Sequence, residues 1–258
     1  MTGTHNDLIR AQFGVRAATF TDAGFAARGS DWILERLAPA ADEQVLDVAA
    51  GAAHLGRALA SRVNHVSALD PTPAMLEQGQ RLAAAGGLRN LTFTVGDAAG
   101  LPYLDGQFDL VVCRLALHRV ADPATMVREM VRVTRQGGRI GLVDMIAEAD
   151  RASAEEADRL ERLRDPSHNR TLPLAEVQGL LVAAGAALAS TALRDEDLDL
   201  EDWLARSRTP DRVSAQIRAR FEEELAGGSA TGLRPVRGAD GALRFTHTWA
   251  VVTGSPRG

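Results

Sequence analysis

Three aspartates stand at the ends of short apolar runs, where their carboxylates could together hold one nucleoside-like ligand. Asp47 precedes a turn of alanine and glycine that includes Gly51, so the backbone there can approach a ligand closely. Roughly 20 residues beyond such a turn, a carboxylate like that of Asp70 can accept both hydrogen bonds of a ribose diol. Asp97 can accept a hydrogen bond from an adenine amino group. Each aspartate alone also has a structural interpretation, as a helix cap or part of a tight turn. The prediction of a ligand site therefore rests on the three positions together.

His118 and His168 are the candidate acid–base groups. An imidazole whose pKa is near neutrality can remove a proton from a phenol, an enol or an activated carbon. His118 follows an apolar run, whereas His168 lies in the polar segment DPSHNR, where a structural hydrogen bond is the alternative. The chain contains no lysine, which excludes a lysine Schiff base. No metal-ligand spacing, phosphate loop or nucleophile elbow is found, so we predict no metal.

Apolar runs alternate with helix-like segments between residues 44 and 147, which predicts the sheet that would position these residues. In PTPAMLEQGQRLAAAGG, Thr72 and Pro73 begin a helix and the two glycines end it. Strands this apolar indicate a parallel sheet covered on both faces, which is a doubly wound α/β fold whose ligands bind at the carboxyl ends of the strands. The strand candidates are QVLDVAA, HVSALD, LTFTVGD, FDLVVCRLAL and GRIGLVDMIA.

The flanking segments have a different pattern. Residues 1–41 carry apolar helical faces and are predicted to form a helical lid that excludes water, while residues 42–258 form one domain. Charged helical stretches around 150–184 and 199–228 are predicted to cap the substrate. ALASTALR reads as a sixth strand, and LRFTHTWAVVTG as a last strand that we expect to be antiparallel.

Composition and charge restrict the classes of partner that we expect the protein to bind. The net charge is −5, with basic residues spread among acidic ones, which argues against nucleic acid. The single cysteine, Cys113, excludes a disulfide framework and favours a reducing compartment. The sequence has neither a signal peptide nor an apolar run that could span a bilayer. We therefore expect a cytoplasmic protein that binds a small molecule and no membrane, and we leave a homodimer open.

The stretch from Val45 to Asp144 resembles the class I S-adenosylmethionine (SAM)-dependent methyltransferases, especially the branch of the ubiquinone and menaquinone C-methyltransferases. LDVAAGAAH stands at the glycine-rich SAM loop, ALDPTPAML at the ribose-binding acid, and VGDAAGLPYLDGQFDLVVCRLALHRVADP at the adenine-binding acid and fourth strand. REMVRVTRQGGRI is similar to the family's helix and turn before the fifth strand, and RDPSHNR to a segment of some relatives. The resemblance implies a Rossmann-like methyltransferase sheet.

By this resemblance, SAM is the cofactor and a small molecule accepts its methyl group on an oxygen, carbon or nitrogen, with specialised metabolism as one setting. Arg114 and Leu115 would border both the sulfonium and the acceptor, and His118 or His168 would act in catalysis. The implied cofactor-binding residues are Asp47, Ala49, Gly51, Asp70, Pro71, Met75, Asp97, Ala98, Arg114 and Leu115.

Two positions depart from the family pattern. Ala53 stands where a glycine is usual, and Arg119 replaces the second histidine of a common pair. The methyl group of Ala53 could crowd the cofactor, so a methyltransferase-like protein with lost or altered chemistry is one alternative. An NAD-dependent oxidoreductase is another, because Gly51, Ala53 and Gly56 mimic part of a dinucleotide fingerprint. That alternative lacks the middle glycine and leaves the Asp97 segment unexplained.

Overall fold

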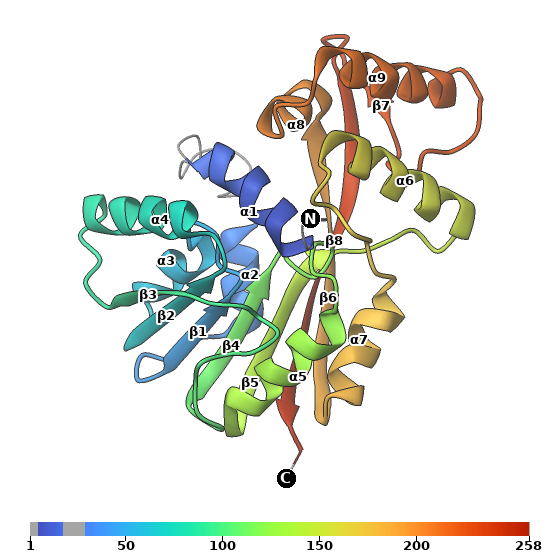
Figure 1. Ribbon diagram of the computed structural model, residues 1–258. Helices are drawn as coiled ribbons and strands as arrows, with labels where there is room; N and C mark the ends of the chain where they lie inside the picture. The colour runs from blue at the N-terminus through green and yellow to red at the C-terminus, as the bar shows by residue number, and fades with distance from the viewer. Residues whose placement is uncertain (1–4, 18–28, 258) are drawn as a thin grey trace.

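The computed structural model describes residues 5–17 and 29–257, and these form a sheet with helices on both faces (Figure 1). Within this part of the chain the strand order is β3-β2-β1-β4-β5-β8-β6, and β7 pairs with β8. The first five strands of that order pair in parallel, while β8 is antiparallel to β5 and β6. The predicted doubly wound sheet with an antiparallel last strand is therefore confirmed. The strands are β1 (Gln44–Val48), β2 (His65–Asp70), β3 (Leu91–Val95), β4 (Phe108–Arg114), β5 (Thr134–Met145), β6 (Ala186–Asp199), β7 (Val236–Arg237) and β8 (Leu243–Pro256).

Two apolar cores lie on opposite faces of the sheet because successive side chains of a strand point to opposite sides. In β4, Val111 and Cys113 pack with α5 (Pro123–Val133) and α7 (Leu174–Ala183). Leu110 and Val112 pack with α2 (Ser30–Leu37) and α3 (His54–Ala60) on the other face. Cys113 is fully buried and free, as its apolar surroundings in the sequence predict.

The helix α4 (Pro73–Ala85) has the predicted ends. Thr72 is its N-cap residue and Pro73 its first residue, while Gly86 follows its last turn. Helix α5 is the helix that the family resemblance implies before the fifth strand. It ends at Val133, and the following TRQGG segment already belongs to β5. The β4–β5 register shifts there between Phe108 and Leu110, so the predicted turn is a strand irregularity.

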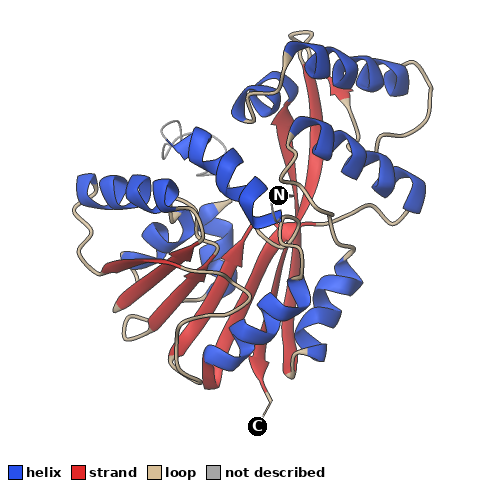
Figure 2. Ribbon diagram, viewed as in Figure 1, coloured by secondary structure: helices blue, strands red, loops and turns tan. Residues whose placement is uncertain are grey.

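An upper lobe rises above the sheet where β6 and β8 extend past the other strands (Figure 2). It contains α6 (Arg151–Arg164), α8 (Leu200–Arg206) and α9 (Asp211–Leu225). The lobe has its own apolar core, which includes Leu160, Trp203, Ile217, Phe221 and Phe245.

The predicted cap segments coincide only in part with this lobe. Helix α7 falls within the predicted 150–184 cap, yet it packs on the sheet beside α5. Val177 and Leu181 of this helix belong to the main core.

The helices within the predicted lid, residues 1–41, lie in different places. Helix α1 (His5–Arg16) crosses above the carboxyl ends of the strands (Figure 1). Helix α2 instead packs against the sheet through Ile33, Leu34 and Leu37, so it is not part of a lid. Residues 18–28 of the predicted lid lie outside the described part of the chain. None of the helices in the described ranges is long and apolar enough to cross a membrane.

Candidate active site

A cavity of about 650 Å³ opens at the carboxyl ends of the central strands, beside the point where the strand order reverses between β1 and β4. We call the part bounded by the loops after β1, β2 and β3 the loop half; it is lined by Asp47, Ala49, Gly51, Asp70, Pro71, Met75, Asp97 and Ala98. We call the part between β4 and the upper lobe the lobe half; it is lined by Leu115, His118, Glu161, Arg164, Trp203, His247 and Trp249, among others.

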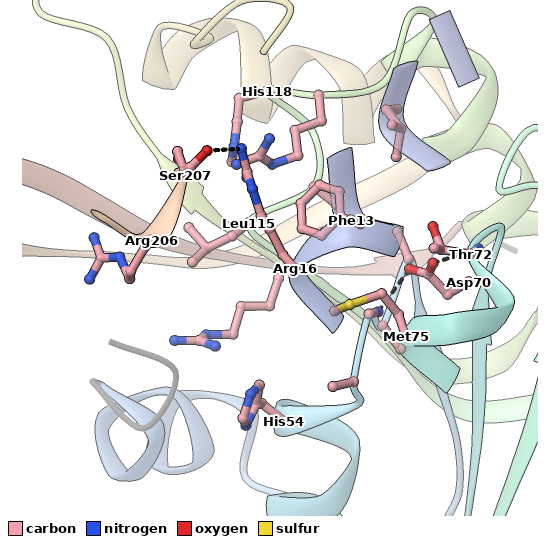
Figure 3. A pocket seen from close by; sticks show the side chains of 18 of the residues that line it. Phe13, Arg16, His54, Asp70, Thr72, Met75, Leu115, His118, Arg206 and Ser207 are labelled. Atoms are coloured by element: carbon pink, nitrogen blue, oxygen red, sulfur yellow. Dashed lines mark hydrogen bonds between the residues drawn. The ribbon is translucent and has the colours of Figure 1, made fainter. Parts of the chain in front are cut away.

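Helix α1 contributes to the walls of both halves. Figure 3 shows its Phe13 and Arg16 side chains among the residues that line the cavity, with His118 and Asp70 among their neighbours in that view. Because one helix contacts both halves, a ligand in either half would lie against the same structural element.

The loop after β1 brings backbone close to the cavity. Gly51 has a φ of 57°, which favours glycine, and an added Cβ there would lie 3.2 Å from Met75 Cε. Ala49 has a similar φ of 54°, which is a strained conformation for a residue with a side chain. The loop therefore leaves little room for side chains and presents mainly backbone to a ligand.

Asp47 is a buried carboxylate at the start of this loop. It is 2% exposed, and its Oδ2 accepts a hydrogen bond of 2.8 Å from the N–H of Gly56. Burial raises its pKa to about 7, although this hydrogen bond and the charge of Arg114 act in the opposite direction. A cationic group of a ligand next to this buried carboxylate would stabilise its ionised form.

Ala53 adopts a left-handed backbone conformation, with φ 53°, immediately before α3. It is fully buried and is not among the residues that line the cavity. A Cβ built on Gly56 would lie 3.5 Å from the Ala53 methyl group, so this methyl faces α3. The departure from the family's glycine therefore does not crowd the cavity.

Asp70 holds the loops after β1 and β2 in place through hydrogen bonds. Its Oδ2 accepts a 2.8 Å hydrogen bond from the N–H of Gly51, and its Oδ1 accepts one of 2.8 Å from the N–H of Thr72. Burial raises its pKa, while these bonds lower it. A carboxylate has about four lone-pair sites, so these two bonds leave acceptor capacity toward the cavity. The structure thus combines the local structural role with a position suited to ligand binding.

The loop after β3 places Asp97 and Ala98 at the far end of the loop half. Asp97 accepts a 2.8 Å hydrogen bond from Asn6 Nδ2 of α1 and a 2.9 Å bond from the N–H of Ala99. Nearby, Arg10 of α1 donates to the carbonyl oxygen of Pro71. Helix α1 therefore contacts two of the three loops that the sequence predicts to bind the ligand, those after β2 and β3.

Arg114 and Leu115 end β4 at the boundary between the two halves. The Arg114 guanidinium lies 5.3 Å from the centre of a Trp249 ring, a cation–π contact. Burial lowers the pKa of Arg114 to about 10, although the carboxylates of Asp47 and Glu196 oppose this shift. Leu115 has a φ of 54°, and its N–H bonds to the Val143 carbonyl. Strain of this kind is common at functional sites.

His118 forms a buried pair with Asp144 at the end of β5. The distance between His118 Nδ1 and Asp144 Oδ1 is 2.6 Å, and Asp144 also accepts bonds from the N–H groups of Leu117 and Met145. An Nδ1–H donated to Asp144 leaves Nε2 of this cavity-lining ring as a proton acceptor. Burial lowers the pKa of His118, although Asp144 opposes the shift.

His168 lies behind His118. Their ring centres are 5.6 Å apart, and His168 Nε2 is 2.7 Å from Asp158 Oδ1. His168 does not line the cavity. This placement corresponds to the structural hydrogen bond that the sequence left as the alternative.

Several site residues were missed by sequence reasoning. They are Asn6 and Arg16 of α1, Asp144 near the end of β5, and Glu161, Arg164, Trp203 and His247 of the lobe half. For Asp144 a signal existed, because it ends a predicted strand just as Asp47, Asp70 and Asp97 do. The lobe residues gave no such signal, since they are distant in the sequence.

No group of histidine, cysteine and carboxylate side chains that could hold a metal ion occurs in the described ranges. A doubly wound sheet with a narrow backbone loop after β1 and acids ending β1 and β2 defines an α/β enzyme of the nucleotide-cofactor class.

Comparison with known proteins identifies the family. A methyltransferase domain family matches residues 45–138. The chain is 34% identical over 207 residues to the uncharacterized methyltransferase YcgJ of Bacillus subtilis, covering 80% of this chain and 82% of that protein. The crystal structure of YcgJ superposes with a TM-score of 0.80 at 29% identity, covering 90% of this chain and 100% of that one. The chain belongs to the class I SAM-dependent methyltransferases.

More distant relatives agree with this assignment. The C-methyltransferase UbiE of ubiquinone and menaquinone biosynthesis from Roseobacter denitrificans is 33% identical over 117 residues, which are 44% of this chain and 45% of that protein. Geranyl diphosphate C-methyltransferase of Streptomyces coelicolor, solved with S-adenosylhomocysteine, shares the fold at 13% identity and a TM-score of 0.63, covering 90% of this chain and 79% of that one. The family thus implies SAM as the cofactor.

The residues of the loop half fit this cofactor. The buried Asp47 carboxylate suits the cationic amino group of SAM, and the space beside Gly51 would be filled by any side chain. The acceptor capacity of Asp70 suits the ribose hydroxyls.

Proposed function

We propose that this enzyme transfers a methyl group from SAM to a nucleophilic oxygen, carbon or nitrogen of a small molecule bound in the lobe half. The observation that carries the proposal is the continuity of the cavity, which runs from Asp70 and Asp97 past Leu115 to His118. A cofactor in the loop half and an acceptor in the lobe half would therefore meet at the end of β4.

In this proposal the loop half holds SAM. Asp47 faces the methionine amino group, Asp70 accepts the ribose hydroxyls and Asp97 accepts the adenine amino group. Ala49, Gly51, Pro71, Met75 and Ala98 shape the walls, and Arg114 with Leu115 border the sulfonium. Bound SAM supplies an electrophilic methyl group, and the protein must position the nucleophile in line with it. Positioning of this kind can contribute about 7–11 kcal/mol in favourable cases.

His118 acts as the general base on the acceptor. Asp144 holds its ring and fixes the tautomer, so Nε2 takes the proton that the nucleophile loses. Because burial lowers the pKa of His118, the ring is neutral and ready to accept a proton at neutral pH. Of the two histidines singled out by the sequence, only His118 lines the cavity, so we assign His168 the role of supporting His118 and Asp158.

Helix α1 acts as a lid over both ligands. Arg16 Nη1 is 2.9 Å from Asp165 Oδ2, and Arg119 Nη1 is 2.8 Å from the same oxygen. The guanidinium of Arg119 also lies 4.9 Å from the centre of the Phe13 ring. These contacts tie α1 to the upper lobe, and their release would open the cavity. Exclusion of water by such a lid prevents side reactions of the cofactor.

The alternative of lost or altered chemistry rested on Ala53, and its methyl group faces α3 rather than the cavity. The oxidoreductase alternative does not apply to a member of this family. Methyl transfer therefore remains the function that the site supports best.

The proposal is tested by incubating the purified protein with SAM carrying a labelled methyl group and a panel of phenols, enolisable ketones and amines. We expect label in at least one acceptor and formation of S-adenosylhomocysteine. Absence of SAM binding, or a product with an unchanged number of methyl groups, would contradict it.

A further inference from the structure

A buried carboxylate lines the lobe half without a function in the proposed methyl transfer. Glu161 of α6 is 3% exposed, and its Oε2 accepts no hydrogen bond. Its basic neighbours are Arg164, with Nη2 at 3.2 Å, and His247, with Nε2 at 3.5 Å. Burial alone would raise the pKa of Glu161, but the charge of Arg164, and that of the surrounding histidines when acid protonates them, lowers it to about 2. The group is therefore ionised and can only accept hydrogen bonds.

The basic groups around Glu161 either have other contacts or carry no charge at neutral pH. The Arg164 guanidinium lies 4.3 Å from the centre of a Trp203 ring, and its Nη1 donates to the Trp203 carbonyl oxygen at 3.1 Å. Burial lowers the pKa of His247 to about 4, although Glu161 opposes the shift, so this ring is neutral at physiological pH. A buried carboxylate with too few donors is stabilised by any ligand that brings an O–H or N–H group.

Two large aromatic side chains lie in the same half of the cavity as Glu161. Trp203 and Trp249 are almost fully buried and both line the cavity. His118 and Glu161 line the same half of the cavity. A single planar molecule in the lobe half could therefore present one group to His118 and another to Glu161.

We propose that Glu161 and His247 form a second polar anchor, which binds a hydroxyl or ammonium group of the acceptor other than the methylated one. This inference rests on the proposed function of the cavity. It defines the acceptor class as a planar, largely apolar molecule with a nucleophile and a separate O–H or N–H donor. A carboxylate or phosphate in place of that donor would face the ionised Glu161 and bind poorly, because the nearby Arg164 is already paired with Glu161 and bonded to the Trp203 carbonyl oxygen.

The test uses four phenols that differ only in the second group. Tyramine carries an ammonium group, tyrosol a hydroxyl, 4-ethylphenol no polar group, and 3-(4-hydroxyphenyl)propionate a carboxylate. Each is titrated at up to millimolar concentration into the full-length protein saturated with S-adenosylhomocysteine. We expect tyramine or tyrosol to bind at least about tenfold more tightly than the other two, the usual effect of a hydrogen bond to a charged group.

Variants on α6 assign the effect to Glu161. Glu161→Gln should reduce the preference for the donor-bearing phenols to within about threefold, whereas Glu155→Gln, the same change at an exposed position of α6, should keep it. Thermal unfolding and the affinity for S-adenosylhomocysteine show whether each variant is folded. If Glu161→Gln does not fold, His247→Gln replaces it and should weaken the same preference.

Three results would overturn the inference: tightest binding of the carboxylate, equal binding of all four phenols, or binding of none. Loss of the preference in Glu155→Gln as strongly as in Glu161→Gln would also overturn it. A protein that fails to bind S-adenosylhomocysteine contradicts the proposed function instead, so the two failures are distinguishable.

Discussion

The two halves of the cavity are built in different ways. In the loop half, backbone and short side chains at the ends of consecutive strands form the walls, as at Gly51 and Asp70. In the lobe half, long side chains converge from separate elements, as do His118 after β4, Glu161 of α6 and His247 of β8. A site lined by backbone tolerates few substitutions, because any added side chain would occupy the space of the ligand. A site lined by side chains can bind a different ligand after one of those side chains is substituted.

This difference separates the chemistry of the two halves. In the proposed function the loop half binds SAM, and its geometry follows from the sheet itself. The lobe half binds the acceptor in this proposal, and its polar groups are held by contacts such as those of His118 with Asp144 and Glu161 with Arg164. Substitutions in the loop half should therefore alter SAM affinity, whereas substitutions in the lobe half should alter catalysis or acceptor binding.

The largest expected effect belongs to the lobe half. With an acceptor whose nucleophile must lose a proton, His118→Ala should lower kcat by about 10²–10⁴-fold, the usual contribution of a general base. SAM affinity should change little, because the residue does not belong to the loop half. Single-turnover kinetics with labelled SAM measures this. The control is His65→Ala, a half-buried histidine at the first position of β2 whose Nε2 contacts Thr92 and which does not line the cavity, so full activity should remain.

The pH dependence sharpens the assignment of His118. Its folded-state pKa is lowered from 6.5, so the base form predominates at pH 7 and above. With SAM saturating, we expect kcat/KM for the acceptor to be flat between about pH 7 and 8 and to fall below pH 6.5 as the ring becomes protonated. A profile of rate against pH measures this. A fall that persists in His118→Ala would assign the titration to another group.

In the loop half, Asp47→Asn should have opposite effects on stability and binding. The folded-state pKa of Asp47 is about 7 against 3.8 unfolded, so its burial destabilises the ligand-free protein increasingly as pH rises from about 4 through 7. The substitution should raise the free energy of unfolding by about 1–3 kcal/mol at pH 8, with little change at pH 4, and should weaken SAM. Urea unfolding at both pH values measures this. Equal destabilisation at both pH values would mean that Asp47 is favourably paired without ligand.

The smallest expected effect is that of Ala53→Gly. Because the Ala53 methyl faces α3, removing it should change SAM affinity by less than about tenfold, or roughly 1.4 kcal/mol. Glycine also suits the positive φ of this position, so stability should change little. Calorimetric titration with SAM measures the affinity. A gain of several hundredfold would show that the natural loop closes the cofactor site.

Sequence and structure agree best where the signal is local. The ends of α4, the strand after each apolar run and the burial of Cys113 follow from periodicity and turn residues, which act over a few positions. Asp47, Asp70 and Asp97 were found for the same reason, since each ends a predicted strand and all such ends meet at one edge of the sheet.

The parts that the sequence did not predict depend on contacts between distant segments. Helix α7 reads as a charged, helical cap segment but packs on the sheet, because Val177 and Leu181 meet the main core. Glu161 and His247 are separated by most of the upper lobe in sequence, and their proximity depends on the extension of β6 and β8 past the sheet. Local sequence patterns do not predict such contacts between distant segments.

The central claim is that SAM occupies the loop half and the acceptor the lobe half. Its most direct test is a calorimetric titration of SAM into the natural protein, Asp70→Ala and His118→Ala, each shown to be folded by circular dichroism. We predict that Asp70→Ala weakens SAM about 10- to 100-fold, since it removes an interaction of roughly 1.5–3 kcal/mol, while His118→Ala stays within about threefold of the natural protein. Unchanged affinity in folded Asp70→Ala, or a loss confined to His118→Ala, would contradict the division of the cavity.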